Sequence, residues 1–305
     1  MSKALTYNTE LQWYQLFHTK GVGPKTLHKL FAIWRREGLP LNANFHDYLK
    51  EIRGRDIILI DSHESFEKLR EKGIKIIHLG HPDYPERILS LLKTDAPPLL
   101  FCQGQAQLLK SKSVAIVGSR NASEEGLRIA RQFAMKLALS GINVVSGYAK
   151  GIDSSAHLGA LEAGGTTTIV LSYGILEFRR KRLFSSLDWE GNVLIVSQFP
   201  ETERWRVRNA MVRNKLVCAL SLGVIAVESD LGGGTFNAGM TAIKLGIPLF
   251  VLSPSEFARK PKGNRRLIAF GGMEIHSSDG IDIVLEHLKS NEVKPPEQLV
   301  LNFQG

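Results

Sequence analysis

The middle of the chain alternates short apolar runs with longer amphipathic stretches. Apolar runs of four or five residues have the length and composition of buried strands, while the stretches between them repeat apolar positions at helical spacing. Strands followed by helices predict an α/β fold whose doubly wound, mostly parallel sheet is covered on both faces. The predicted strands are 114–117, 142–145, 167–171, 193–196, 224–228 and 248–252, and the predicted helices are 123–140, 153–163, about 204–221, 234–245 and about 280–289.

The first part of the chain has a different pattern. Residues 9–37 place apolar side chains at helical spacing on either side of Gly21-Val22-Gly23-Pro24, which predicts a helix, a turn and a second helix. Backbone N–H groups at such a turn, with Lys25 beside them, suit a phosphate, as in a helix-hairpin-helix or SAM-like domain. The alternative is a plain helical hairpin whose glycines only turn the chain.

These patterns divide the chain into three parts. We expect a small N-terminal helical domain over 1–68 and the α/β domain over 69–290, which begins with strand-like runs at 74–79 and 99–102. Residues 291–305 have the composition of a polar tail.

Composition narrows the class of protein. The 305 residues contain no targeting signal or apolar run long enough to span a membrane, so a cytoplasmic protein without membrane contact is expected. A formal net charge of +9 favours a polyanionic partner such as nucleic acid, although basic residues can also serve only solubility. Cys102 and Cys218 have no Cys or His neighbours at ligand spacing, so we expect no metal site.

Loops at the carboxyl ends of the parallel strands are the expected place for a ligand. The first, Gly118-Ser119-Arg120, combines a glycine, a hydroxyl and a guanidinium ahead of a helix that Ser123 can cap. Helix-end N–H groups and an arginine fork both favour an oxyanion. The alternative is that Arg120 only pairs with a nearby carboxylate.

A second loop, residues 146–153, offers Ser146, Gly147, Lys150 and Gly151 to a ligand. Asp153 can cap the helix that follows, and His157 lies one turn further on. No nucleophile with an oxyanion hole accompanies them, so we expect structural roles for Asp153 and His157 and no catalytic residues.

Two later segments extend the candidate phosphate site. The helix near 204–221 carries Arg213, Asn214 and Lys215, and Gly233, Gly234 and Thr235 open the next helix with flexible backbone. Basic clusters recur at 178–182, 204–215 and 259–266. Trp205, Tyr173 and Phe178 lie among them and could stack on bases, although core packing is the more ordinary role for the last two.

Several blocks of this sequence resemble the DprA/Smf family. They are VAIVGSR, SGYAKGIDSSAH and GALEAGGTTTIVL, followed by the helix 213–221 and a G-x-N-x-L-I loop at 263–268. The segment PDYPERILSLLKTDAPPLLFCQG is similar to the strands that enter the family's main domain, so the resemblance spans roughly residues 75–275. It implies a divergent member, and the residues after 290 are too few for the winged-helix domain that many members carry.

The resemblance implies a function as well as a fold. The family has an extended Rossmann-like fold, forms homodimers, protects single-stranded DNA in a basic pocket and loads it onto a RecA-like recombinase in natural transformation and homologous recombination. It is not known as an enzyme and takes no cofactor. Transferred to this sequence, Arg120 would clamp a phosphate, and the pocket would be completed by Gly118, Ser119, Ser146, Gly147, Lys150, Gly151, Arg213, Asn214 and Lys215. We expect Arg120→Ala and Arg213→Ala to weaken DNA binding with little change in stability.

The main alternative is a Rossmann protein that binds a nucleotide or a nucleotide-derived signal, either as a sensor, with an antiviral role as one setting, or as a phosphoribohydrolase-like enzyme. The stretch 232–235 resembles the glycine part of the phosphoribohydrolase motif. That motif places glutamate where this chain has Ala238, so the group that would activate water is missing.

Overall fold

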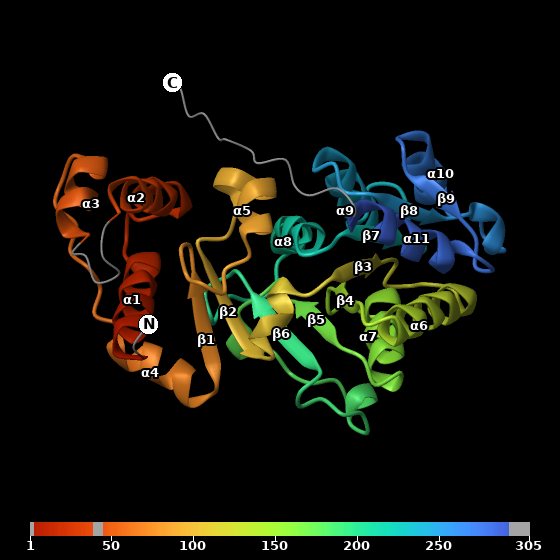
Figure 1. The fold of residues 1–305 in the computed structure, drawn as a ribbon, viewed down its shortest axis with the longest axis horizontal. Helices are drawn as coiled ribbons and strands as arrows, with labels where there is room; N and C mark the ends of the chain where they lie inside the picture. Colours follow the sequence, from red (N-terminus) through yellow and green to blue (C-terminus); the bar gives the residue numbers. More distant parts are fainter. Residues whose placement is uncertain (1–2, 39–44, 293–305) are drawn as a thin grey trace.

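A computed structural model describes residues 3–38 and 45–292 of the chain, which form a nine-stranded sheet with helices on both faces (Figure 1). The strand order is β1-β2-β6-β5-β4-β3-β7-β8-β9. Strand β2 runs antiparallel to both neighbours, and all the other pairings are parallel. The strands are β1 (Ile74–His78), β2 (Leu99–Gly104), β3 (Ser113–Val117), β4 (Asn143–Ser146), β5 (Thr167–Val170), β6 (Val193–Ser197), β7 (Gly223–Ala226), β8 (Leu249–Leu252) and β9 (Met273–Ile275).

The central strands are buried at every position and mostly apolar, because both of their faces are covered. In β3, Val114 and Ile116 belong to a core beneath α6 (Glu124–Leu139), α7 (Ile152–Glu162) and α11 (Gly280–Glu292). The alternate residues Ala115 and Val117 belong to the core on the opposite face. The predicted doubly wound, mostly parallel α/β fold is therefore confirmed.

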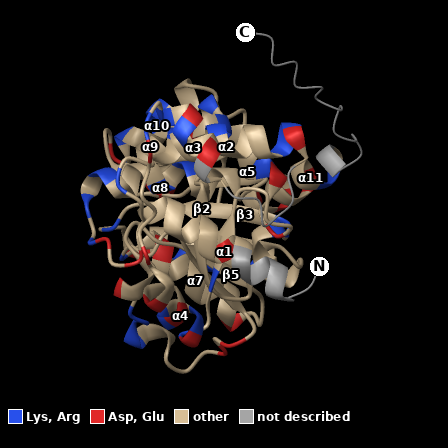
Figure 2. Cartoon of the chain, turned by 90° about the vertical axis from the view of Figure 1, so that its left-hand side faces the viewer, with Lys and Arg blue, Asp and Glu red and all other residues tan. Residues whose placement is uncertain are grey.

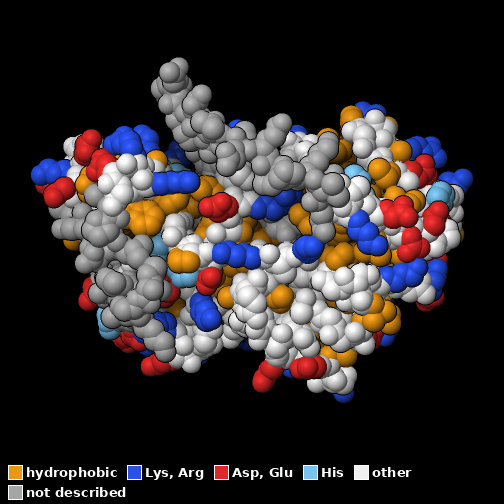
Figure 3. Space-filling view, viewed as in Figure 1, with side chains coloured by type: hydrophobic (Ala, Val, Ile, Leu, Met, Phe, Trp, Pro, Cys, Tyr) orange, Lys and Arg blue, Asp and Glu red, His pale blue; other side chains and the backbone are white. Residues whose placement is uncertain are grey.

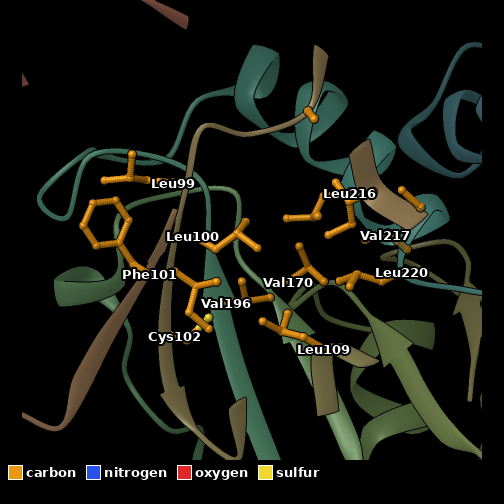
Figure 4. Packing of buried hydrophobic residues seen from close by; sticks show 14 of the residues in the cluster. Leu99, Leu100, Phe101, Cys102, Leu109, Val170, Val196, Leu216, Val217 and Leu220 are labelled. Carbon is orange, nitrogen blue, oxygen red and sulfur yellow. The ribbon is translucent and has the colours of Figure 1, made fainter. Parts of the chain in front are cut away.

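The second core lies beneath α5 (Glu86–Leu92), α8 (Val207–Ala219) and α9 (Gly234–Lys244). Figure 4 shows how α8 reaches the sheet: Leu216, Val217 and Leu220 lie close to Val170 at the end of β5. This packing holds the carboxyl-terminal half of α8 firmly and directs its first turns beyond the ends of the strands.

The helical N-terminal region packs against the antiparallel side of the sheet. It contains α1 (Lys3–His18), α2 (Pro24–Glu37), α3 (His46–Arg53) and α4 (His63–Glu71). Gly23 precedes α2 with extended backbone and Pro24 occupies its first turn, so the predicted helix-turn-helix is present. The ring of Tyr14 lies 6.3 Å from that of Phe101 on β2, and one buried cluster runs through both regions.

The last part of the α/β region differs from the sequence interpretation. The sequence places the G-x-N-x-L-I segment in a loop, and this is wrong, because the segment forms helix α10 (Lys262–Ala269) and is followed by the edge strand β9. The helix is only eight residues long, so its apolar spacing covers too few turns to be distinctive. Helix α11 ends at Glu292, and the rest of the predicted polar tail lies outside the described residues.

None of the helices within the described ranges combines the length and apolar character needed to cross a membrane.

Candidate nucleic-acid interface

A cavity opens where the winding of the sheet changes direction. From β3 the chain adds β4, β5 and β6 on one side, and it then returns to place β7, β8 and β9 on the other. Loops that follow β3 and β7 diverge at this point, which is where open α/β sheets bind ligands. The cavity has a volume of about 340 Å³, and its lining includes Gly118, Ser119, Arg120, Gly147, Asp153, Trp205, Arg213, Asn214, Gly233, Gly234 and Thr235.

The loop after β3 is fixed by its neighbours on both sides. The amide of Ser119 donates to the carbonyl of Glu228 at 2.8 Å, and the Glu228 carboxylate accepts from the amide and hydroxyl of Ser123, which caps α6. A Cβ on Gly118 would lie 2.3 Å from the side chain of Ile152, so only glycine fits there. The loop is therefore held rigidly with Arg120 at its exposed tip.

Arg120 stands over an exposed aromatic ring. Its guanidinium carbon lies 5.3 Å from the ring centre of Trp205, which is 46% exposed and lines the cavity. Cation–π contact of this kind keeps the indole in place while part of its surface remains open to solvent. The alternative role of Arg120, pairing with a carboxylate, is not found among the ion pairs of the described residues.

Arg213 and Asp153 both lie against Gly147. A Cβ on Gly147 would lie 1.9 Å from Nη1 of Arg213 and 2.4 Å from Oδ2 of Asp153, so the bare glycine backbone makes room for both. Asp153 also accepts from the amide of Ala149 at 3.2 Å. Burial raises the pKa of Asp153, and the positive charge of Arg213 opposes that rise.

Arg213 itself is only 8% exposed. Its Nη1 donates to the carbonyl of Val170 at 2.8 Å, while its buried Nε has no hydrogen-bond partner within the described structure. Burial lowers the pKa of Arg213, and Asp153 works against that decrease. A buried cation that lines a cavity and keeps an unsatisfied donor is a favourable neighbour for an anion.

The amino-terminal end of α9 forms another wall. Gly233 is its N-cap, and Asn214 donates through Nδ2 to the Gly234 carbonyl and to Oδ1 of Asn237, each at 3.0 Å. The first N–H groups of a helix have no partner within it and carry partial positive charge. Asn214 thus fixes this positive helix end against α8, facing the cavity.

Charge is distributed unevenly around this region. In Figure 2, Lys and Arg positions are frequent in the upper half of the view, where α2, α3 and α5 are labelled together with α8, α9 and α10. Within the described ranges, no cluster of three His, Cys, Asp or Glu residues is placed to hold a metal ion.

Comparison with known proteins identifies the family of this chain. A family model described as "DNA recombination-mediator protein A" matches residues 75–286, which is more than half of the chain. The chain belongs to this family. It is the DprA/Smf family that the sequence resembles.

Two curated relatives illustrate the range of similarity. Protein Smf of Escherichia coli is 37% identical over 172 residues, which cover 55% of this chain and 45% of that protein. DNA processing protein DprA of Streptococcus pneumoniae is 33% identical over 193 residues, covering 63% and 67%. The chain thus spans less than half the length of the E. coli relative.

Two solved DprA structures share the fold. The DprA structure from S. pneumoniae superposes with a TM-score of 0.73 at 25% identity, over 90% of this chain and 97% of that one. A DprA structure from Helicobacter pylori, whose description concerns its single-stranded DNA binding mode, gives 0.60 at 27% identity, over 70% and 96%. Both matches support an extended Rossmann-like fold for this DprA/Smf family member.

Not every predicted site residue of this DprA/Smf protein reaches the cavity. Ser146 is buried and donates to the carbonyl of Ile116 at 2.6 Å, and Lys150 is exposed outside the lining. Gly151 has a left-handed φ of 74° and lies against the Ser119 carbonyl, so it shapes the loop without lining the cavity. Lys215 turns away and forms an ion pair of 2.7 Å with Asp95.

Two side chains of the basic cluster at 178–182 have structural roles that the sequence did not reveal. Nζ of Lys181 donates to the carbonyls of Tyr148 and Ala149 and to the hydroxyl of Ser154, each at 2.9 Å. Arg180 donates to the carbonyls of Phe184 and Leu187. Lys181 therefore braces the loop that carries Gly147, whereas Arg180 holds the segment 184–187. Phe178 stacks on Trp189 as ordinary packing.

His157 has the expected structural geometry. It is fully buried, its Nε2 lies 2.6 Å from the carbonyl of Gly147, and its Nδ1 lies 2.6 Å from the hydroxyl of Thr167. Burial lowers the pKa of His157 to about 4, so the ring is neutral at pH 7. It anchors the carbonyl of Gly147 and thereby the floor beneath Arg213.

Asn264 is a contributor that sequence reasoning missed. It is fully buried, and it donates to the carbonyls of Val227 and Leu252 at 2.8 Å while accepting from the amide of Ser229 at 2.8 Å. It ties the ends of β7 and β8 together beneath the loop that leads to α9. The G-x-N pattern was visible in the sequence. That the Asn264 amide is buried, however, can be inferred only once the segment is recognised as a helix.

Proposed function

We propose that this protein binds single-stranded DNA without sequence preference, in the cavity at the carboxyl edge of β3 and β7. The observation that carries the proposal is the convergence of buried Arg213, the Arg120–Trp205 pair and the amino-terminal end of α9 on one cavity. The H. pylori DprA structure, which is described by its single-stranded DNA binding mode, supports the same ligand class.

Each part of the cavity suits one part of a nucleotide. The helix end at Gly233 and Gly234 and the guanidinium of Arg120 attract a backbone phosphate. The exposed indole of Trp205 offers a stacking surface to a base, which is sequence-tolerant because every base has an aromatic face. We therefore expect affinity to depend on salt and little on base composition.

The proposal extends to a wider role in the cell. We propose that the bound strand is protected and loaded onto a RecA-like recombinase, in natural transformation or homologous recombination, by a homodimer. The description of the family as a recombination mediator supports this role. We propose no catalytic step.

A nucleotide-sized ligand is the second candidate. The cavity volume of about 340 Å³ falls within the range of small-molecule sites. Ala238 lines the same cavity where a phosphoribohydrolase motif would place glutamate, so this candidate is a sensor of a nucleotide or nucleotide signal without turnover.

One titration separates the two candidates. Fluorescent oligo-dT is bound to the purified protein at low and high salt, and unlabelled dTMP is then added as competitor. Salt-sensitive binding that survives excess dTMP is the expected result. Absence of oligo-dT binding at low salt would overturn the proposal, and tight dTMP binding without oligo-dT binding would favour the sensor.

A further inference from the structure

A second cavity, with a volume of about 720 Å³, lies between the N-terminal helices and the α/β region. Helix α2 forms one side, and the chain that joins β1 to α5 forms the other (Figure 1). Figure 3 shows apolar and basic side chains side by side in the part of the face formed by α2 and α5. This cavity shares no lining residue with the candidate nucleic-acid interface.

One wall of the second cavity is aromatic. Phe31 and Trp34 of α2 have ring centres 5.9 Å apart, and Tyr84 faces the cavity from the other side. A Cβ on Gly80 would lie 2.2 Å from Cζ3 of Trp34, and Gly80 has a left-handed φ of 82°. The backbone at the start of the segment Gly80–Tyr84 is therefore shaped around the indole, which is only partly buried and lines the cavity.

The cavity lining also carries positive charge. Lys110 donates through Nζ to the carbonyl of Pro82, and Arg87 donates through Nη2 to the carbonyl of Ser221 at 2.9 Å. Carbonyl oxygens carry no net charge, so these contacts orient the two cations without neutralising them. Arg35 and Lys112 bring the lining cations to four, and among the described lining residues Glu86 is the one carboxylate.

Helix α8 borders both cavities. The lining of the first cavity includes residues from Val207 to Val217 along this helix, and Ala219 at its end lines the second. Thirteen residues at 1.5 Å each make the helix about 20 Å long, which corresponds to roughly six nucleotides at the 3.4 Å rise of a stacked strand. A strand held at one cavity is therefore within reach of the other.

We propose that the cavity between α2 and α5 is a second site for a nucleotide unit. Trp34 stacks on the base, and Arg35, Arg87 and Lys110 attract the phosphate. The bound nucleotide unit is either a free mononucleotide or part of a single strand that already occupies the first cavity. The second of these sources rests on the proposed function.

Photochemical crosslinking tests the proposal at the residues themselves. The probes are 5-iodo-dUMP alone, and dT oligomers of about six and about twenty nucleotides that carry one 5-iodo-dU. Adducts are mapped by mass spectrometry to the peptides that contain Trp34 and Trp205. The Arg35→Ala/Lys110→Ala variant is compared with a control, Lys136→Ala/Lys289→Ala, which removes two exposed cations from α6 and α11 on the other face of the sheet.

We expect an adduct at Trp34 that falls about tenfold in Arg35→Ala/Lys110→Ala and is retained in the control. An adduct formed with 5-iodo-dUMP identifies a free nucleotide, and one formed only with the longer oligomer identifies a bridging strand. The second site would be overturned if no probe formed an adduct at Phe31, Trp34 or Tyr84. It would also be overturned if the adduct yield were the same in Arg35→Ala/Lys110→Ala as in wild type. The Trp205 adduct reports separately on the first cavity, so failure of the proposed function can be distinguished from failure of the second site.

Discussion

The guanidinium of Arg213 occupies the space that a side chain on residue 147 would need. A Cβ built on Gly147 would lie 1.9 Å from Nη1 of Arg213. The absence of a side chain at Gly147 therefore makes room for Arg213, as well as for a ligand. It lets Arg213 enter the floor of the cavity and face Asp153.

Arg213→Ala is expected to cost stability as well as DNA binding, which revises the expectation from sequence. Removing Arg213 takes away the positive charge that opposes the rise in the pKa of buried Asp153, and a buried charge left uncompensated costs about 3–5 kcal/mol. Urea unfolding measures this loss. If unpaired Asp153 is the cause, Asp153→Asn/Arg213→Met will be more stable than Arg213→Ala, and equal stabilities would contradict it.

Arg120→Ala is expected to weaken oligo-dT binding while leaving the free energy of unfolding within about 0.5 kcal/mol of wild type, because Arg120 is exposed. Loss of one phosphate contact should reduce the slope of log affinity against log salt by about 0.7 for a single strand. Fluorescence anisotropy at several salt concentrations gives the slope. Lys136→Ala, an exposed cation on α6, is the control, and an equal effect there would remove the specific role of Arg120.

Asn264→Ala is expected to destabilise the protein by more than a typical surface substitution. It leaves the Ser229 amide and the Val227 and Leu252 carbonyls without their partner, and each unsatisfied buried group costs about 1–3 kcal/mol. Thermal unfolding measures the change. Arg265→Ala, one residue along α10 and exposed, should unfold like wild type, and similar losses in both would point to the helix instead of the amide.

Stability should fall between pH 6.5 and about 4 because of His157. Burial lowers its folded-state pKa to about 4 from an unfolded value near 6.5, so only the unfolded chain takes up the proton in this window. The contribution of the neutral ring to the free energy of unfolding is fully present above pH 6.5 and is lost as the pH falls toward the folded-state pKa. His157→Gln should therefore show a shallower loss of unfolding free energy from pH 7 to pH 4 than wild type.

His78 contributes to the same pH dependence. Burial lowers its pKa to about 3, and its ring stacks on Trp13 at 5.1 Å. The test of His157 is therefore the difference between variant and wild type, since His78 is common to both. An unchanged difference across the window would contradict the assignment to His157.

The sequence predicted most of the α/β region because its signals are local. Helix α6 was expected at 123–140 and lies at Glu124–Leu139, since an N-cap serine and a long apolar stripe mark it. Gly118, Arg120 and Gly147 come together because strand ends of a parallel sheet share one edge, which follows from periodicity and topology. The place of Arg213 in the pocket was implied by the family resemblance.

Other features depend on partners far apart in the chain. Lys215 lies on the helix that carries Arg213, but it pairs with Asp95, which is 120 residues away. Lys181 belongs to a basic cluster, yet its ammonium group is held by loop carbonyls. A charged residue in a sequence does not disclose whether its charge meets solvent, a ligand or the backbone.

The hydroxyl of Tyr14 donates to Oε1 of Glu201 at 2.6 Å, and Nε2 of His18 lies 3.1 Å from Oε2 of the same carboxylate. Glu201 lies four residues before Trp205, in the stretch between β6 and α8. Because a buried cluster also runs from α1 through β2, we expect the N-terminal helices and the sheet to unfold as one cooperative unit, with a single transition in calorimetry. Removing the first 68 residues would then expose Phe101 to water. It would also release Glu201 from Tyr14 and His18, and with it the segment that carries Trp205.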